Sequence, residues 1–323
     1  MKNIIVKTIV GIALPVLLFA WGNDMVVDTM RRIDNEFPVT YDIIWPNDTN
    51  MIIAIGYDYQ NTDSYVNLYQ SNDQGQTITN FVSMHYYGHK TKSIQLRYSD
   101  QYGLLLWSTT DGELWMLIFD LNTLTYVTAS QIANSDSVVA ASFTKIVKND
   151  TLTIYVATTS RNSSYDVMKI YRSIDYGSFE KVDSVAYANS AVYRTYRDID
   201  AIIHGDSIKV YATYEIIDRS TNDKDYNFWI FNDQPDRLFT YRTTRNLEID
   251  PSVNSNYPSL GVAPGGYLIG LYEANGDIKY VFSNDYGNSV VTYDFPFDTA
   301  DSSEATPVVI PWNIPPYYRG FNT

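Results

Sequence analysis

The sequence of 323 residues contains no cysteine and only three histidines. These absences exclude disulfides, thiol nucleophiles and most of the patterns that bind zinc. Basic side chains are also few, because 23 lysines and arginines face 37 aspartates and glutamates, giving a net charge of -14. Nucleic acid binding needs clustered basic residues that release counterions from phosphates. We therefore expect no nucleic acid partner.

Long amphipathic segments are absent as well. Beyond Pro38, short apolar runs of strand length alternate with clusters of Asn, Asp, Ser and Gly, the pattern of strands and turns rather than of helices. The 29 tyrosines and 6 tryptophans suit pleated, half-buried surfaces. The sequence therefore predicts an all-β protein.

The first 22 residues differ from the rest of the chain. Two lysines precede an apolar run over 9–19, and residues 20–22 end it at a spacing that a signal peptidase reads, so we expect a signal peptide over 1–22. The alternative is a membrane anchor, but the run is shorter than the ~20 residues of a span and contains Pro15. We expect a secreted, extracellular or cell-surface protein, with a periplasmic location as an alternative, and no membrane span after signal removal.

The strand-length runs group in fours, and an acidic turn recurs between the third and fourth run of each group. The acids of these turns are Asp73, Asp120, Asp175, Asp233 and Asp285. A four-stranded unit with a period of about 50 residues is typical of a β-propeller, in which each unit is a blade that packs on its neighbours. We expect a β-propeller of four-stranded antiparallel blades.

The predicted propeller occupies residues 38–323, after a lead-in or closing strand over 23–37. Five blades are visible, and a partial sixth follows them. We expect a six-bladed propeller truncated at its C-terminus, hence a monomer or part of a longer chain, and the alternative is a five-bladed ring with a tail. The predicted blades are 38–88, 92–131, 138–187, 196–246, 257–297 and the partial 305–323.

Three copies of the acidic turn share the pattern Ser-x-Asp-x-Gly. This motif resembles the Asp-box, or BNR repeat, of sialidase-like β-propellers. Its carboxylate can accept backbone N–H bonds, and its glycine can adopt an angle that other residues resist. The resemblance implies structural turns on the face opposite the binding site. The three copies are Ser71, Asp73 and Gly75; Ser173, Asp175 and Gly177; and Ser283, Asp285 and Gly287.

The candidate ligand face of a propeller consists of the loops that leave each second strand and enter each first strand. Arginine binds carboxylates through a two-pronged contact, and tyrosine stacks on sugar rings. The alternative is a solvated loop whose aromatic residues pack between blades. The candidate ligand-binding residues are Tyr193, Arg194, Tyr196, Arg197 and Arg219 around the predicted start of blade four, with His85, Tyr86 and Tyr87 at the end of predicted blade one.

A metal site is not expected from the sequence. His85 and His89 lie in one short cluster, but no third nitrogen ligand is near them in the sequence. We expect no metal and no cofactor.

The resemblance implies either binding or glycoside hydrolysis. In sialidases an arginine trio holds the substrate carboxylate, and a tyrosine assisted by a glutamate is the nucleophile. Arg32, Arg197 and Arg245 with Glu215 are the candidates for those roles, although Arg32 lacks the flanking aromatic residue and proline of the sialidase motif. We expect a non-catalytic module that binds a glycan or an extracellular protein. The alternatives are an exo-sialidase or related glycoside hydrolase, and a structural module of a larger surface protein.

Overall fold

A computed structural model describes most of the chain between residues 13 and 294. The predicted partial blade over 305–323 lies outside the described residues. Backbone is described for residues 13–18, 26–32, 38–47, 49–59, 63–73, 75–133, 137–233, 242–246, 255–274 and 277–294. Side chains are described for residues 40–47, 49–57, 63–73, 75–85, 87–133, 137–233, 259–272 and 279–293.

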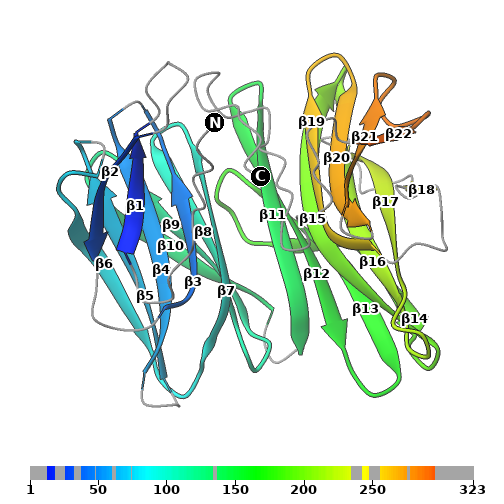
Figure 1. Cartoon of the computed structure of the whole chain (residues 1–323), viewed down its shortest axis with the longest axis horizontal. Helices are drawn as coiled ribbons and strands as arrows, with labels where there is room; N and C mark the ends of the chain where they lie inside the picture. Colours follow the sequence, from blue (N-terminus) through cyan, green and yellow to red (C-terminus); the bar gives the residue numbers. More distant parts are fainter. Residues whose placement is uncertain are drawn as a thin grey trace. The chain divides into compact units, whose positions relative to one another are not determined.

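The described residues form strands and no helix (Figure 1), and they divide into two compact units, 1–131 and 132–323. The strands of the first unit are β1 (Ala13–Leu18), β2 (Val26–Arg32), β3 (Pro38–Ile44), β4 (Met51–Tyr59), β5 (Asp63–Ser71), β6 (Thr79–Tyr86), β7 (Thr91–Ser99), β8 (Tyr102–Thr109), β9 (Leu114–Asp120) and β10 (Thr125–Ala133), which ends just past the boundary.

The second unit continues the same four-strand pattern. Its strands are β11 (Val138–Lys148), β12 (Thr151–Arg161), β13 (Tyr165–Ile174), β14 (Glu180–Ala188), β15 (Val192–His204), β16 (Ser207–Asp218), β17 (Lys224–Asp233), β18 (Arg242–Asn246), β19 (Ser255–Ala263), β20 (Tyr267–Ala274), β21 (Asp277–Ser283) and β22 (Val291–Asp294).

Five sheets of four strands follow one another along the chain, each an antiparallel meander in sequence order. We call them blades 1 to 5. The first strands of consecutive blades touch within each unit, β3 with β7, and β15 with both β11 and β19. The prediction of four-stranded antiparallel blades is therefore confirmed.

The start of blade 4 differs from the prediction. β15 begins at Val192, so residues 193–195 are strand rather than loop, because β16 is long enough to pair with them up to Asp218. The register shifts between Tyr196 and Asp198, which places Arg197 at a bulge. A bulge bends a strand and redirects its side chain.

β2 pairs with β1 in a separate two-stranded sheet. The signal peptide over 1–22 and the closing strand within 23–37 stay predictions. In the part of the chain that the structure describes, no helix has the length and apolar character needed to span a membrane.

Large aromatic side chains fill the space between blades 3 and 4. Trp229 is almost fully buried and packs edge-on against Tyr196, with their ring centroids 5.5 Å apart. Tyr214 and Phe231 contact the same indole. Met168 of blade 3 is buried in the same apolar cluster. Burial of each such side chain contributes roughly 2 to 3 kcal/mol. Blade packing is therefore apolar, as expected for a chain without disulfides.

Two carboxylates on β15, buried Asp200 and half-buried Asp198, join three blades through their first strands. Asp200 accepts hydrogen bonds from the Val262 amide of β19 at 2.9 Å and from the Thr144 hydroxyl of β11 at 3.0 Å. Two residues earlier, Asp198 accepts the Leu260 amide at 3.0 Å. Burial raises the pKa of Asp200 to about 7. These two acids therefore link the first strands of neighbouring blades by hydrogen bonds.

The same device recurs in the first unit. Asp42 of β3 accepts the Leu96 amide of β7 at 2.7 Å, and Arg97 lies beside it. Burial raises the pKa of Asp42, while Arg97 opposes that rise. Sequence reasoning did not single out these acids, because their partners lie more than 50 residues away along the chain.

The β21–β22 turn is closed by its own side chains. The Asp285 carboxylate accepts the Ser289 amide at 2.9 Å and the Ser289 hydroxyl at 2.6 Å. The Ser283 hydroxyl donates to Asp285 and accepts the buried amide of Gly287 at 2.9 Å. Gly287 has a φ of 79°, the left-handed region that glycine tolerates. Serine, aspartate and glycine therefore each have a local role in closing this turn.

The β5–β6 turn repeats this geometry. Asp73 accepts both the amide and the hydroxyl of Thr77, and Ser71 accepts the Gly75 amide at 2.6 Å. Hydrogen bonds from Thr77 lower the pKa of Asp73 to about 2, and those from the corresponding serine do the same for Asp285. Both carboxylates are therefore ionised at neutral pH and accept the hydrogen bonds that close their turns.

The third copy, between β13 and β14, works differently. Its carboxylate, from Asp175, accepts the Leu152 amide of β12 at 3.0 Å. Asp175 and Tyr176 adopt positive φ angles of 47° and 62°, while Ser173 donates to the carbonyl of Gly177. This copy closes differently because its turn is one residue shorter than the other two. Its acid instead ties the turn to a neighbouring strand.

These contacts predict that the turn serine matters more than the turn aspartate. Ser283→Ala leaves the buried Gly287 amide unpaired, and we expect a loss of about 1 to 3 kcal/mol in the free energy of unfolding. Asp285→Ala removes bonds that face solvent, and we expect a loss of about 1 kcal/mol or less. Urea denaturation of both variants at pH 7 checks this order. A larger loss for Asp285→Ala would contradict it.

Candidate functional site

Three loops meet at one end of blades 3 and 4. They are the β12–β13 turn, the β14–β15 connection and the β16–β17 turn. The Asn189 amide donates to the Ser164 carbonyl at 3.0 Å, and the Arg219 amide donates to the Ala191 carbonyl at 3.0 Å. The β13–β14 turn with Asp175 lies at the opposite end of blade 3 (Figure 1). The end predicted to carry ligand loops is therefore a continuous, hydrogen-bonded surface.

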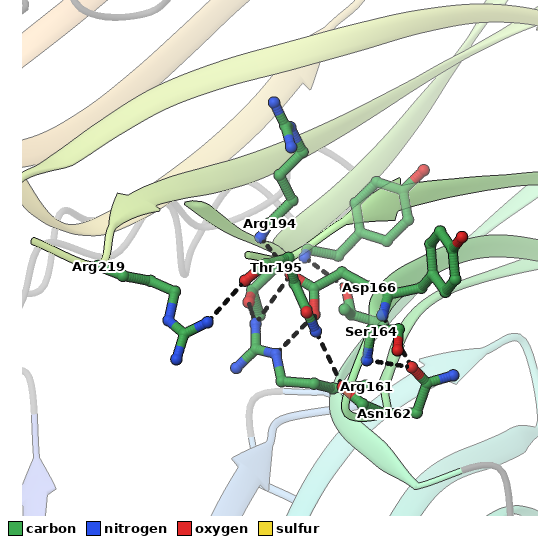
Figure 2. Close-up of polar contacts among 11 residues, drawn as sticks. Arg161, Asn162, Ser164, Asp166, Arg194, Thr195 and Arg219 are labelled. Atoms are coloured by element: carbon green, nitrogen blue, oxygen red, sulfur yellow. Dashed lines mark hydrogen bonds and ion pairs between the residues drawn. The ribbon is translucent and has the colours of Figure 1, made fainter. Parts of the chain in front are cut away.

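A buried carboxylate organises this surface. Asp166, at the start of β13, has no exposed side-chain area and accepts Arg161 Nε at 2.6 Å. It also accepts the Arg194 amide of β15 at 2.6 Å (Figure 2). A terminal nitrogen of Arg161 also donates a hydrogen bond to the Thr195 hydroxyl at 3.0 Å. One acid thus fixes the ends of β12 and β15 together.

Two guanidinium groups lie close to the Tyr193 ring. Arg161 lies 4.0 Å and Arg219 lies 4.9 Å from its centroid. Cations over an aromatic face are attracted by its quadrupole, by about 0.5 to 2 kcal/mol each. Arg219 also donates to the carbonyls of Asn189 and Ser190. Tyr193 therefore holds an arginine from the end of β12 beside one from the β16–β17 turn.

Arg194 adds a third positive charge. Its guanidinium lies 4.4 Å from the centroid of the Tyr187 ring, and Figure 2 shows its side chain directed away from Asp166. Arg219 is exposed, and the half-buried carboxylate next to it, Asp218, caps its own turn through Ser220. Three arginines thus lie at one end of blades 3 and 4, and buried Asp166 binds the side chain of Arg161 and the backbone amide of Arg194. We call Arg161, Arg194, Arg219 and Tyr193 the arginine cluster.

Arg197 and Glu215 form a separate pair beside the cluster. Arg197 donates to Glu215 through Nε at 3.0 Å, and its terminal nitrogen forms a shorter contact. The second carboxylate oxygen accepts the Tyr226 hydroxyl at 3.0 Å. Glu215 and Tyr226 are each 1% exposed. The two predicted residues are brought together, but the carboxylate is covered by its partners.

One predicted ligand residue is misplaced. Tyr196 is 1% exposed and belongs to the core around Trp229, so its ring is not on the ligand surface. The alternation of side chains along a strand explains this, because β15 extends through Tyr196 and turns its ring between the blades.

The other predicted residues lie elsewhere. Arg245 is on β18, the fourth strand of blade 4, and Arg32 is on β2, and their side chains are outside the described set. His85 and Tyr87 belong to the first unit, where His85 bonds Asp63 at 3.1 Å and its ring lies 3.8 Å from Tyr87. The side chain of Tyr86 is likewise not described.

Sequence reasoning missed Arg161 and Asp166, which lie on either side of the β12–β13 turn. The available signal was position, because Arg161 ends the second strand of its blade and therefore stands where ligand loops begin. Their pairing with Thr195 and the Arg194 amide could not be inferred, since these lie about 30 residues further on.

No family model matches this chain, and no curated protein matches it in sequence. Solved structures do resemble it. An α-L-arabinanase from Penicillium chrysogenum, complexed with arabinobiose, has a TM-score of 0.50 at 12% identity, with 84% of each chain covered. An α-L-arabinofuranosidase from Fusarium graminearum has a TM-score of 0.52 at 10% identity, covering 84% of this chain and 83% of its own.

A third similar structure is a polysaccharide lyase, an ulvan lyase. Its TM-score is 0.53 at 9% identity, and the match covers 82% of this chain and 71% of the lyase. At such low identity these matches define the fold alone. Together with the successive four-stranded meanders, they assign the chain to the β-propellers.

Proposed function

We propose that this β-propeller is a secreted or cell-surface protein that binds carbohydrate through the arginine cluster, without cleaving it. The observation that carries the proposal is the arginine cluster itself. Arg161 and Arg219 lie on the Tyr193 ring, Arg194 lies on the neighbouring Tyr187 ring, and Arg161 is paired with buried Asp166. Arginine presents paired N–H donors to carboxylate and sulfate groups. The ligand expected is therefore a glycan with an anionic group.

Charge supports this choice of ligand. The whole chain carries a net charge of -14, so a general attraction to anions is not expected. The three arginine side chains of the cluster carry three positive charges. The carboxylate that they contact is Asp166, through Arg161, whereas Arg194 and Arg219 lie on tyrosine rings. Local positive charge on an acidic protein favours a specific anionic group over non-specific polyanion binding.

The preformed geometry supports binding too. Asp166 fixes Arg161, and the Asn189 and Ser190 carbonyls fix Arg219. Side chains that are already ordered lose little entropy when a ligand docks. The described similar structures include proteins named for arabinan, arabinofuranoside and ulvan, which agrees with a carbohydrate ligand.

The burial of Glu215 and Tyr226 favours binding over catalysis at this site. A nucleophile or general acid must come within hydrogen-bond reach of the substrate. Both residues are 1% exposed and bonded to each other. A hydrolytic role for this pair would require Arg197 to move away first.

Binding measurements on arginine variants test the proposal. We expect a glycan array to select oligosaccharides with carboxylate or sulfate groups, and Arg194→Ala and Arg219→Ala each to weaken the selected ligand about 10- to 100-fold by calorimetry, since a hydrogen bond to a charged group contributes about 1.5 to 3 kcal/mol. Lys181→Ala is the control, because Lys181 is an exposed cation on β14 outside the cluster. Equal affinity of all three variants would refute the site.

The enzymatic alternative is tested with the same protein. Incubation with sialyl, arabinofuranosyl and uronate-containing oligosaccharides, followed by chromatography of the sugars, reveals any cleavage. Intact ligand supports a binding module. Turnover that Glu215→Gln abolishes would establish a glycosidase instead.

A further inference from the structure

Two loops at one end of blade 2 bring a histidine and two carboxylates together. His89 lies in the β6–β7 connection, and Asp111 and Glu113 lie in the β8–β9 turn. Their ligand atoms all fall within 4.8 Å of one another. His89 Nδ1 is in direct contact with the Asp111 carboxylate. This group belongs to the first unit and is independent of the arginine cluster.

The two loops are held in place by their backbone. The Thr110 amide of the β8–β9 turn donates to the Lys90 carbonyl of the other loop at 2.8 Å. Within the turn, the Thr109 amide donates to the Glu113 carbonyl at 3.0 Å, and the Glu113 amide donates to the Thr109 hydroxyl at 3.1 Å. The three side chains therefore converge from a braced scaffold rather than from free loops.

We propose that His89, Asp111 and Glu113 bind a divalent transition metal ion, with zinc as the preferred ion. Zinc takes imidazole nitrogen at about 2.0 to 2.1 Å and carboxylate oxygen at about 2.0 to 2.2 Å. Ligand atoms around a tetrahedral ion at those distances lie roughly 3.3 to 3.5 Å apart. The observed spread needs only side-chain rotation to close on such an ion.

Charge and surroundings fit a divalent cation. Two carboxylates and a neutral imidazole supply a charge that matches the ion. Trp115 Nε1 donates to Glu113 Oε2 at 3.2 Å, which orients that carboxylate from outside the group of three ligands. Such outer partners commonly fix metal ligands. Calcium is disfavoured because it prefers oxygen ligands in larger number.

The site is open to solvent. The side chains of His89 and Asp111 are 27% and 47% exposed. Three protein ligands leave a fourth position of the ion for water or for an oxygen of a ligand. The class of molecule that the bound ion would accept is therefore an oxygen donor.

The chain supplies an internal contrast. His85 also contacts one carboxylate, Asp63, yet among the described residues only the His89 group brings three potential ligands together. The sequence suggested no metal because no third nitrogen ligand was near His89. In the structure the further ligands are instead two carboxylates, which come from the β8–β9 hairpin.

Zinc titration of the full chain, with any affinity tag removed, tests the proposal. We expect one ion per chain by calorimetry, and affinity reduced on the order of 100-fold in His89→Gln, Asp111→Asn and Glu113→Gln. Trp115→Phe should weaken binding about tenfold, because it removes only the outer hydrogen bond. His204→Gln is the control, since His204 is an exposed histidine of the second unit, beside Tyr286.

A second readout separates binding from misfolding. Zinc should raise the melting temperature of the wild type and of His204→Gln, and should not raise that of the three ligand variants. Circular dichroism confirms that each variant is folded. Zinc affinity that is equal in the wild type and all ligand variants, or no stoichiometric binding by the wild type, would overturn the proposal.

Discussion

We expect Asp200→Ala to lower the free energy of unfolding by about 3 kcal/mol, the largest loss of stability among the changes considered. The Asp200 carboxylate accepts the Val262 amide, the Thr144 hydroxyl and the Ala201 amide. Alanine leaves these donors unpaired in a buried place, and unpaired buried donors cost about 1 to 3 kcal/mol each. Urea denaturation at pH 7 measures the loss.

The matched control is an exposed acid of the same hairpin. Asp206 lies in the turn between β15 and β16, and Asp206→Ala should change the free energy of unfolding by less than about 0.5 kcal/mol. Equal effects of the two substitutions would mean that Asp200 does not join the blades.

The Asp200 carboxyl also predicts a pH dependence. Its folded-state pKa of about 7 lies above the ordinary aspartate value, so between about pH 4 and 7 the folded chain holds a proton that the unfolded chain releases. The wild type should therefore lose stability relative to Asp200→Asn as the pH rises through that window. A constant difference between the two proteins from pH 4 to 8 would contradict the assignment.

We expect Asp166→Ala to disrupt both the fold of the ligand loops and carbohydrate binding. The substitution removes the partner of Arg161 and the acceptor of the Arg194 amide. Loss of one member of a buried pair costs about 3 to 5 kcal/mol, and the partial exposure of Arg161 brings the expected loss to roughly 2 to 3 kcal/mol. Carbohydrate affinity should fall on the order of 100-fold, because Arg161, Arg194 and Tyr193 lose their common support.

Two measurements separate these effects. Urea denaturation gives the stability loss without any ligand, and calorimetry at a temperature where the variant is folded gives the affinity. The Asp206→Ala variant again serves as the control. Unchanged stability would show that Asp166 does not organise the loops, whereas lost stability with unchanged affinity would refute the proposed function alone.

Local pattern carried the prediction of the blades. Two of the recurring turn acids, Asp73 and Asp285, depend on neighbours four residues away, so the sequence displays those interactions in full. The apolar runs on either side of these turns are also a local signal, because their length alone indicates strands. The four-stranded antiparallel architecture could therefore be predicted from the sequence, although the length of β15 could not.

Contacts between blades could not be predicted in the same way. Asp200 and Val262, or Asp42 and Leu96, meet only after separate blades have packed. The same limit applies to the ligand loops, where Asp166 meets the Arg194 amide across two blades. Aromatic residues on β15 were ambiguous too, because the extension of the strand decides whether Tyr193 or Tyr196 faces solvent.

One measurement tests the central claim most directly. The anionic oligosaccharide selected on the array is titrated into the wild type and into Arg219→Ala, and the sugar is then recovered and analysed by chromatography. We predict saturable binding by the wild type, affinity at least about tenfold weaker in the variant, and recovery of intact sugar. Binding of equal strength in both proteins, or recovery of cleaved sugar, would contradict the account.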